Sequence, residues 1–239
     1  MQTKDSINKY AGCYNTEVDF DRYFIDFRFR CLQENYPNLG DALELGCANG
    51  LMTKNLLEIS KSLEVVEGGE HYILATKKKL GAKAEAIKFN HSLFIDFESN
   101  KKYDAIIFSS MLHEVDEPVE LLKKYKNLIK EDGMIYINVP NAQSLHRQIG
   151  KEMGMLENLY EFNERDIKFC HQRIYDMKSL VADIEGAGWQ IKKKGGFFLK
   201  MLSNSQLNGL EPKMISALYN VSKDIPAELC AEIYVFATL

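Results

Sequence analysis

Hydrophobic and polar positions alternate in blocks along this chain, and the blocks predict strands and helices in turn. Continuous apolar runs are typical of strands buried in a parallel sheet, because both of their faces are covered. Such runs predict strands at 42–45, 63–67, 103–109 and 134–139, with a short strand near 85–89. Apolar residues at helical spacing predict helices over 21–33, 50–60, 70–80, 118–130 and 176–187.

The chain closes with two strands, at 189–199 and 231–239, on either side of a helical stretch over 203–224. Strands that alternate with helices predict an α/β fold with a mostly parallel sheet and helices on both faces. We expect residues 39–239 to form one domain. Within it, the stretch 141–175 has mixed polarity and no strand pattern. We expect a partly helical insertion there, lying over the carboxyl edge of the sheet.

Residues 1–38 are rich in aromatic side chains and predict an N-terminal helical cap. The cap has two interpretations. It is either a core helix with a wide apolar face, or a lid that closes over a ligand and excludes water. On the lid interpretation Tyr10 and Tyr14 are its working residues, and Tyr14 contacts the substrate.

Composition narrows the class of protein. Of 239 residues, 46% are hydrophobic and 27% are charged, which is ordinary for a globular domain. The net charge of −4 argues against a general nucleic-acid surface. The five cysteines form no C-x-x-C pair, the first residues are too polar for a signal peptide, and no apolar run approaches the ~20 residues of a membrane span. We expect a cytoplasmic monomer or homodimer with no nucleic-acid or membrane partner.

The segment Ala42–Gly50, with the sequence ALELGCANG, carries the most information about ligands. An apolar strand contains Glu44, a turn bounded by Gly46 and Gly50 follows, and a helix comes next. Glycines leave room for a ligand, and the helix N-terminus directs unpaired N–H groups and a partial positive charge at it. The dinucleotide fingerprint G-x-G-x-x-G fails at its third and sixth positions, and the P-loop fails because no Gly-Lys-Ser/Thr ending follows.

What remains, E-x-G-x-x-x-G after a strand, resembles motif I of the class I S-adenosylmethionine (SAM) dependent methyltransferases. The later phrases VPNAQSLHR (139–147) and CHQRIY (170–175) resemble a subset of small bacterial members, with Cys170 where that subset has Gly. The resemblance implies a Rossmann-like, seven-stranded, mostly parallel sheet with an antiparallel last strand. It also implies SAM as the cofactor, S-adenosylhomocysteine as its product, and a small-molecule acceptor.

The resemblance places the cofactor at the ends of successive strands. We expect it to contact Glu44, Gly46, Cys47, Ala48, Gly50, Glu67, Gly68, Ser92, Leu93, Ser109 and Ser110. Glu67 ends an apolar strand, where a carboxylate can accept both ribose hydroxyls, and Glu70 is the competing choice. The adenine is held either by Ser92 with Leu93 or by Asp96.

Methyl transfer from a sulfonium is an in-line displacement with a neutral leaving group. The enzyme must therefore chiefly position the acceptor, and a hydroxyl or amine acceptor also benefits from a base. The candidate catalytic residues are His113, after the central strand, and His146 and His171, in the insertion. Relatives commonly have histidine where this chain has Glu114, so His113 and Glu114 stand in reversed order. Each histidine can instead be a hydrogen-bonded loop residue.

The insertion also offers side chains for the acceptor. The candidate acceptor-binding residues are Tyr14, Asn141, Arg147, Arg173 and Tyr175. If the insertion folds back over the sheet, its His-Arg pairs form a cationic pocket for phosphate or carboxylate. Otherwise they tie the insertion down through backbone carbonyls. We expect methyl transfer to a small polar, anionic acceptor (phosphorylated, sugar-nucleotide or carboxylate), chiefly at oxygen, without a metal.

Three other functions are less well supported by the sequence. Nucleic-acid methyltransferases of this superfamily usually carry Asn/Asp-Pro-Pro-Tyr/Phe after the fourth strand, where this chain has Ser109-Ser-Met-Leu112. A SAM-binding regulatory protein without catalysis stays open because the usual adenine acid is missing. An NAD-dependent oxidoreductase is disfavoured by the glycine spacing.

Overall fold

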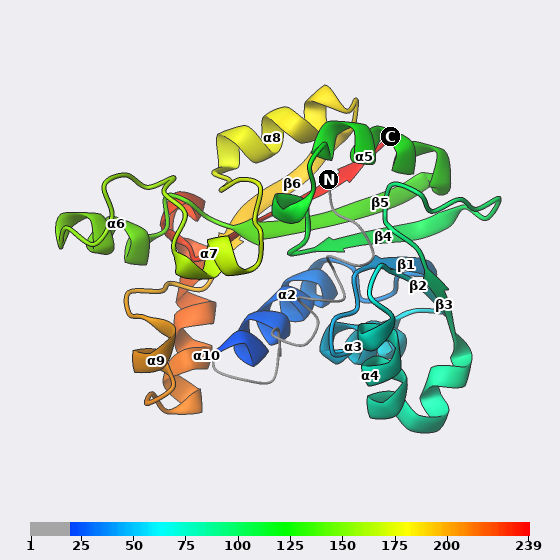
Figure 1. Ribbon diagram of the computed structural model, residues 1–239, viewed down its shortest axis with the longest axis horizontal. Helices are drawn as coiled ribbons and strands as arrows, with labels where there is room; N and C mark the ends of the chain where they lie inside the picture. The colour runs from blue at the N-terminus through cyan, green and yellow to red at the C-terminus, as the bar shows by residue number, and fades with distance from the viewer. Residues whose placement is uncertain (1–19) are drawn as a thin grey trace.

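The computed structural model describes residues 20–239, and these residues form a seven-stranded sheet between helices (Figure 1). The strands are β1 (Asp41–Leu45), β2 (Ser62–Glu67), β3 (Ile87–His91), β4 (Tyr103–Ser109), β5 (Ile129–Pro140), β6 (Gln190–Phe197) and β7 (Glu232–Thr238). Their order in the sheet is β3-β2-β1-β4-β5-β7-β6. All neighbours from β3 to β5 pair in parallel, whereas β7 is antiparallel to both β5 and β6. The expected Rossmann-like sheet with an antiparallel last strand is confirmed.

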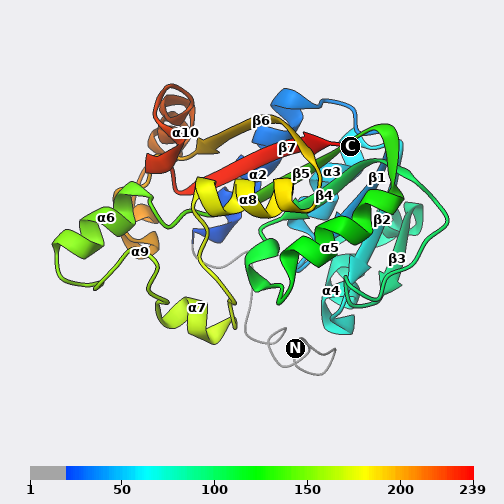
Figure 2. The same ribbon diagram turned by 90° about the horizontal axis from the view of Figure 1, so that it is seen from above.

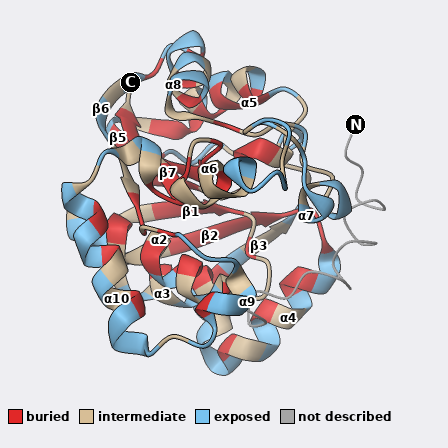
Figure 3. Cartoon of the chain, turned by 90° about the vertical axis from the view of Figure 1, so that its left-hand side faces the viewer, coloured by how far each residue is buried: buried red, intermediate tan, exposed pale blue. Residues whose placement is uncertain are grey.

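Helices cover both faces of this sheet. The α-helices are α2 (Asp21–Asn35), α3 (Leu51–Ile59), α4 (Glu70–Leu80), α5 (Pro118–Tyr125), α6 (Leu145–Glu152), α7 (Glu164–Lys168), α8 (Met177–Gly186), α9 (Asn204–Leu207) and α10 (Pro212–Val221). One face is covered by α2, α3, α4 and α10, and the other by α5 and α8 (Figures 1 and 2). Side chains alternate along each strand, so one strand supplies both cores. In β1, Ala42 packs on the α2 side, and Leu43 and Leu45 on the α5 side. Figure 3 shows the strands as the buried interior, with exposed residues on the outer faces of the helices.

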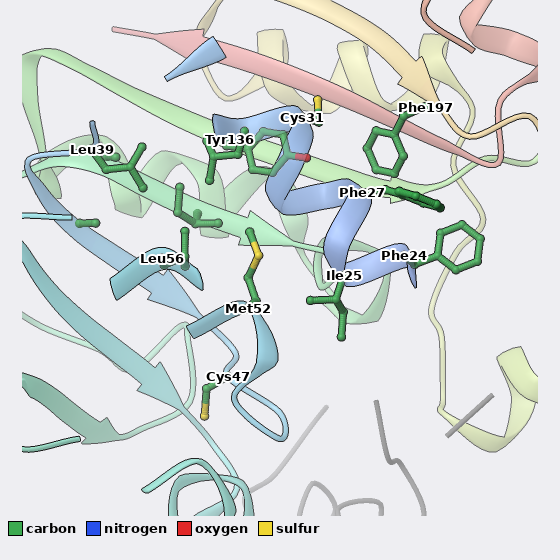
Figure 4. Packing of buried hydrophobic residues seen from close by; sticks show 14 of the residues in the cluster. Phe24, Ile25, Phe27, Cys31, Leu39, Cys47, Met52, Leu56, Tyr136 and Phe197 are labelled. Atoms are coloured by element: carbon green, nitrogen blue, oxygen red, sulfur yellow. The ribbon is translucent and has the colours of Figure 1, made fainter. Parts of the chain in front are cut away.

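The N-terminal helix α2 is a core helix. Phe24 and Phe27 lie beside Phe197 of β6 (Figure 4). The ring of Phe27 also stacks on Phe198 and Tyr219, with centroids 4.8 Å and 5.0 Å away. Such aromatic pairs stabilise by more than their buried area alone. The lid residues Tyr10 and Tyr14 lie outside the described residues, so that interpretation stays a prediction.

The helix expected over 118–130 is shorter than predicted. It ends at Tyr125, and β5 already begins at Ile129, because Ile129 pairs with Tyr103 of β4 and is fully buried. Gly133, which follows the expected helix, therefore lies inside β5. Glycine is required there by close packing, since a Cβ would lie 3.0 Å from the carbonyl oxygen of Tyr103 and 2.7 Å from the Ile129 side chain.

The strands bring distant parts of the chain to one edge of the sheet. The parallel strands and β6 all end there, and β7 begins there, because Glu232 pairs with Pro140 of β5 and Phe197 of β6. The insertion contributes α6 and α7 beyond this edge (Figure 1). Among the described residues, every helix is too short or too polar to cross a membrane.

Candidate active site

A cavity of about 310 Å³ opens at the carboxyl edge of the sheet. Two groups of residues line it. The glycine-loop side comprises Gly46, Cys47, Ala48, Glu67, Tyr72 and Phe94. The insertion side comprises Asp21, Arg28, His113, Glu114, Arg165, Asp166, His171, Lys200 and Glu232. Ser109 and Ser110, at the end of β4, also line the cavity.

The glycine loop has an unusual backbone. Gly46, Ala48 and Gly50 have φ of 83°, 42° and 78°, in the left-handed region that favours glycine. The Ala48 carbonyl accepts a hydrogen bond from Thr76 Oγ1 at 3.0 Å, which holds the strained residue. Gly50 faces away from the cavity lining, and a Cβ on it would lie 2.8 Å from the Thr76 side chain. Gly46, Cys47 and Ala48 therefore face the ligand space, while Gly50 lets α3 begin close to α4.

Of the two acids considered for the ribose, Glu67 is the one that lines the cavity. Its Oε2 accepts the Cys47 N–H at 3.0 Å and its Oε1 accepts the Gly69 N–H at 2.8 Å. Burial raises the pKa of this carboxyl, and the backbone N–H donors oppose the rise. A carboxylate oxygen can accept more than one bond, so both oxygens can still receive a hydroxyl. Glu70, the competing choice, is exposed at the start of α4.

Some expected cofactor residues lie just behind the cavity lining. The Gly68 carbonyl bonds the His91 ring Nε2 at 3.0 Å, and the Ser92 N–H donates to the Glu67 carbonyl at 3.1 Å. Leu93 is also outside the lining, and Phe94 lies on it instead. Sequence analysis missed Phe94, although an aromatic residue just beyond a strand is a natural wall for a planar ring.

Glu44 lies beneath the glycine loop and outside the cavity lining. It is fully buried on β1, and neither carboxyl oxygen has a hydrogen-bond partner among the described residues. Burial, with a smaller contribution from the charge of Glu67, raises the pKa of Glu44 to about 8. Its effect on a cofactor is therefore indirect, through the loop and through charge.

The insertion side gathers a polar cluster around two histidines. A one-turn 3₁₀ helix after β4 (Leu112–Glu114) carries His113 and Glu114, and the insertion brings His171 beside them. The two imidazole rings meet edge to face, with centroids 4.3 Å apart. His171 Nδ1 bonds Asp166 Oδ1 at 2.8 Å, and His113 Nε2 lies 3.9 Å from Glu114 Oε1. The insertion does fold back over the sheet, as the cationic-pocket interpretation required.

Burial shifts the pKa values of two groups in this cluster. Burial, reinforced by His171 and Arg28, holds the pKa of His113 well below its usual range, so its ring is neutral. Burial in the cavity raises the pKa of Glu114 to about 8, with the Glu67 charge adding to the rise. Asp166 fixes the orientation of the His171 ring by bonding Nδ1, so Nε2 is the ring nitrogen that is not bonded to Asp166. Possible metal ligands are His113, Glu114 and His171, whose ligand atoms lie within 4.8 Å of one another.

The arginines of the insertion mainly hold backbone carbonyls. Arg147 donates from Nε to the Leu159 carbonyl at 3.0 Å and from Nη2 to the Glu161 carbonyl at 2.6 Å. Arg173 Nη2 donates to the carbonyls of Val115 and Asp116, at 2.9 Å and 2.6 Å. Both residues still line the cavity, but these bonds are the ones expected if the arginines hold the insertion in place through backbone carbonyls.

The other acceptor candidates are also anchored. Asn141 Nδ2 donates to the carbonyls of Glu228 and Cys230, each at 2.8 Å, and the Tyr175 hydroxyl donates to Asp183 at 2.6 Å. His146 lines the cavity, and burial lowers its pKa to about 2, so its ring carries no charge there. Tyr14 lies outside the described residues.

Sequence analysis missed the charged residues that α2, β6 and β7 bring to the insertion side. Arg28 makes a two-point ion pair with Glu232, with its Nε 2.9 Å from Glu232 Oε2, and Asn138 Nδ2 donates to the same carboxylate at 2.8 Å. Lys200 is 9% exposed and follows β6. One signal was available: an antiparallel last strand begins at the carboxyl edge, which places its first residue, Glu232, at the site.

The glycine-loop side fits the SAM expected from the sequence. The loop leaves Gly46 open to the cavity, where a Cβ would approach only the Phe94 ring, at 3.5 Å. Glu67 supplies a buried carboxylate for hydroxyl donors, and Tyr72 and Phe94 supply aromatic walls. Backbone groups, one acid and aromatic rings are the donor set that an amino-acid tail, a ribose and an adenine require.

Known proteins agree with this assignment. The family model described as a methyltransferase domain matches residues 16–194. Nodulation protein S of Azorhizobium caulinodans is 31% identical over 105 residues, which are 43% of this chain and 50% of that protein. A ubiquinone biosynthesis O-methyltransferase of Glaesserella parasuis is 20% identical over 157 residues, which are 58% of this chain and 66% of that protein. The chain thus spans only half to two thirds of these relatives.

Among solved structures, the N-methyltransferase NodS of Bradyrhizobium japonicum WM9, in complex with S-adenosylhomocysteine, superposes with a TM-score of 0.61. The identity is 11%, and the match covers 99% of this chain and 98% of that one. At this identity the likeness supports the fold alone. The family match covers most of the chain, and it agrees with the glycine loop and the acid after β2. The chain belongs to the methyltransferase-domain family and has the Rossmann-like fold of class I SAM-dependent methyltransferases.

Proposed function

We propose that this enzyme transfers the methyl group of SAM to an oxygen of a small polar, anionic acceptor. The observation that carries the proposal is the hydrogen bond from His171 to Asp166, in the same cavity as the glycine loop. The cofactor supplies an electrophilic methyl group and leaves as a neutral thioether. The residues of the chain must then hold the acceptor in line and take up its proton.

The His171–Asp166 pair suits a hydroxyl acceptor. A hydroxyl is a poor nucleophile until a base takes its proton, and a carboxylate behind a histidine holds the ring in the tautomer that accepts a proton at the far nitrogen. Neutral His113 lies against the ring of His171 and keeps water from that side. Glu114 is the second candidate base, because its raised pKa of about 8 makes it a stronger base than an ordinary carboxylate.

The anionic part of the proposal rests on the cations of the insertion side. Arg28, Arg165 and Lys200 line the cavity from three different elements. Cations that face a small cavity from several directions attract an anionic ligand and repel a cationic one. The relatives do not decide the acceptor atom, because one is an N-methyltransferase and another an O-methyltransferase.

The test is a turnover assay with SAM and a panel of hydroxy acids and hydroxyalkyl phosphates, with the methylated atom identified by NMR. The variant His171→Gln should lower kcat by about 10²–10⁴, the usual contribution of a general base. Its affinity for S-adenosylhomocysteine should stay the same, because His171 is outside the glycine-loop side. The matched control is His71→Gln, since His71 is an exposed histidine on α4.

Each part of the proposal can fail separately. A methyl group found on nitrogen would refute the oxygen assignment. An unchanged kcat in His171→Gln would remove His171 as the base and leave Glu114. Turnover restricted to neutral acceptors would refute the anionic class.

A further inference from the structure

Lys200 carries a buried charge that has no acidic partner of its own in the part of the chain that the structure describes. It is 9% exposed and lines the cavity. Within residues 20–239, its side chain makes a hydrogen bond from Nζ to Asn204 Oδ1 at 2.7 Å and lies 5.7 Å from the ring of Phe24, and no carboxylate pairs with it. Buried charges in proteins are normally paired, because removing them from water is costly.

The carboxylates near Lys200 are committed to arginines. Asp21 forms an ion pair with Arg165, and Glu232 forms one with Arg28. Three cations therefore face two carboxylates, and the surplus positive charge is that of Lys200. Burial, with Arg165 next, lowers the pKa of Lys200 to about 8, while the charges of Asp21 and Glu232 raise it.

Helix α6, which also lies near Lys200, brings a cation and a neutral imidazole. Arg147 of α6 also lowers the pKa of Lys200, and His146 beside it is held neutral, in part by the charge of Lys200 itself. The protein thus surrounds Lys200 with groups that leave its charge uncompensated. A ligand that brings a negative charge would restore the balance.

The backbone holds Lys200 in place before any ligand arrives. The Phe198 N–H donates to Ser222 Oγ at 2.8 Å, and the Phe198 carbonyl accepts the Ala231 N–H at 2.8 Å. The Leu199 N–H donates to the Leu218 carbonyl at 3.3 Å. Two anchored residues directly before Lys200 fix where its side chain starts, so little ordering is left to the binding step.

We propose that Lys200, with Arg165 beside it, forms a subsite for one oxyanion, either a phosphate or a carboxylate, at the end of the cavity away from the glycine loop. The inference rests on the proposed function in one respect, namely that the anion is part of the methyl acceptor. The acceptor then has an oxyanion at Lys200 and a hydroxyl that reaches His171. Both groups line the same cavity, so one small molecule can span them.

The subsite can be tested without turnover, by calorimetric titration of the protein saturated with S-adenosylhomocysteine. Inorganic sulfate serves as the tetrahedral probe and acetate as the carboxylate probe. Lys200→Met keeps the apolar stem and removes the charge, and should weaken binding of the preferred probe at least tenfold, or about 1.4 kcal/mol. The matched control is Lys213→Met, because Lys213 is exposed on α10.

The pH dependence gives a second readout that does not need the neutral variant to fold. Lysine with a pKa of about 8 loses its charge as pH rises through that value, so sulfate should bind about tenfold more weakly at about pH 9 than at about pH 7. Sulfate itself does not titrate in this range. Lys200→Arg should remove most of this loss, because arginine stays charged. What persists comes from Glu114, which lines the same cavity and gains a negative charge over the same range, since its pKa is also about 8.

The outcomes separate the subsite from the proposed function. Equal probe affinity in Lys200→Met and the parent protein would overturn the subsite, and so would a parent protein that binds neither probe. Stronger binding of sulfate assigns the phosphate class, and stronger binding of acetate assigns the carboxylate class. If the probes bind as expected while no acceptor is methylated at oxygen, the subsite stands and the proposed function fails.

Discussion

The two sides of the cavity are built in opposite ways. On the glycine-loop side, Glu67 bonds the backbone of Cys47, only 20 residues away, and backbone N–H groups do much of the work. On the insertion side, Arg28 pairs with Glu232 across 204 residues, and the groups are charged side chains. The first side is a local loop between two strands, whereas the second exists only after the whole chain has folded.

This difference has a consequence for function. A backbone cradle can change its side chains without losing its ligand, so it suits the one cofactor that all members of the family share. A site of long-range side chains can change with each substitution, so it suits an acceptor that differs among relatives. The insertion side is therefore where the specificity of this enzyme is expected to lie.

The largest expected effect comes from breaking the Arg28–Glu232 pair. Glu232→Leu removes the two-point carboxylate bond to the Arg28 guanidinium, whose side chain is only 12% exposed, and should destabilise the protein by about 3–5 kcal/mol. The double variant Arg28→Met with Glu232→Leu removes both charges and should recover most of that loss. Denaturant unfolding measures both variants.

An exposed ion pair provides the control for this experiment. Lys83 and Glu58 are bonded at 2.7 Å, but both side chains are more than half exposed. Lys83→Met should leave the free energy of unfolding nearly unchanged, because water screens such pairs. If Glu232→Leu were equally mild, the insertion side would not depend on buried charge, and the contrast between the two sides would disappear.

The sequence predicts the strands and helices well where their determinants are local, although Gly68, Ser92 and Leu93 lie outside the cavity lining. The helix expected over 70–80 is α4 to the residue. The helix expected over 176–187 is α8, which Asp176 caps by accepting a hydrogen bond from the Ser179 N–H at 2.7 Å. The prediction fails at 118–130, where amphipathic spacing continues past Tyr125 although Ile129 is already paired with β4. Sheet pairing is a long-range interaction, and it overrides a local helical pattern.

The insertion side was only partly predictable. His113 and His171 stand in recognisable phrases, and the structure brings them together. Arg28 and Glu232 stand in no motif, and Lys200 only ends the phrase GGFFLK (195–200), which resembles the same bacterial subset. Each of the three looks like an ordinary surface charge until α2, β6 and β7 are packed. Arg147 shows the reverse case: its phrase suggested a ligand contact, but its guanidinium is bonded to two backbone carbonyls.

A smaller effect tests the glycine-loop side. Glu67→Ala should weaken S-adenosylhomocysteine binding more than tenfold, because it removes a carboxylate that can accept hydroxyls and that also holds two loop N–H groups. Glu70→Ala is the matched control, because Glu70 is exposed three residues later. Calorimetry on both variants decides between the two acids. Equal affinities, or a loss only in Glu70→Ala, would reject the assignment of Glu67 to the ribose.

The smallest expected effect is that of removing divalent metals. His113, Glu114 and His171 are close enough together to bind a metal ion, but two nearby positive charges would repel that ion. The Arg28 guanidinium is near enough to lower the pKa of both His113 and Glu114, and the methyl donor is itself a cation. A chelator should therefore leave turnover within about twofold of its untreated value.

Cobalt(II) absorption gives an independent readout, because a bound ion with nitrogen ligands has visible bands. A stoichiometric cobalt spectrum that His171→Gln abolishes, together with turnover lost to the chelator, would make the insertion side a metal centre. The acceptor proton would then be lost to a metal-activated oxygen rather than to His171 alone.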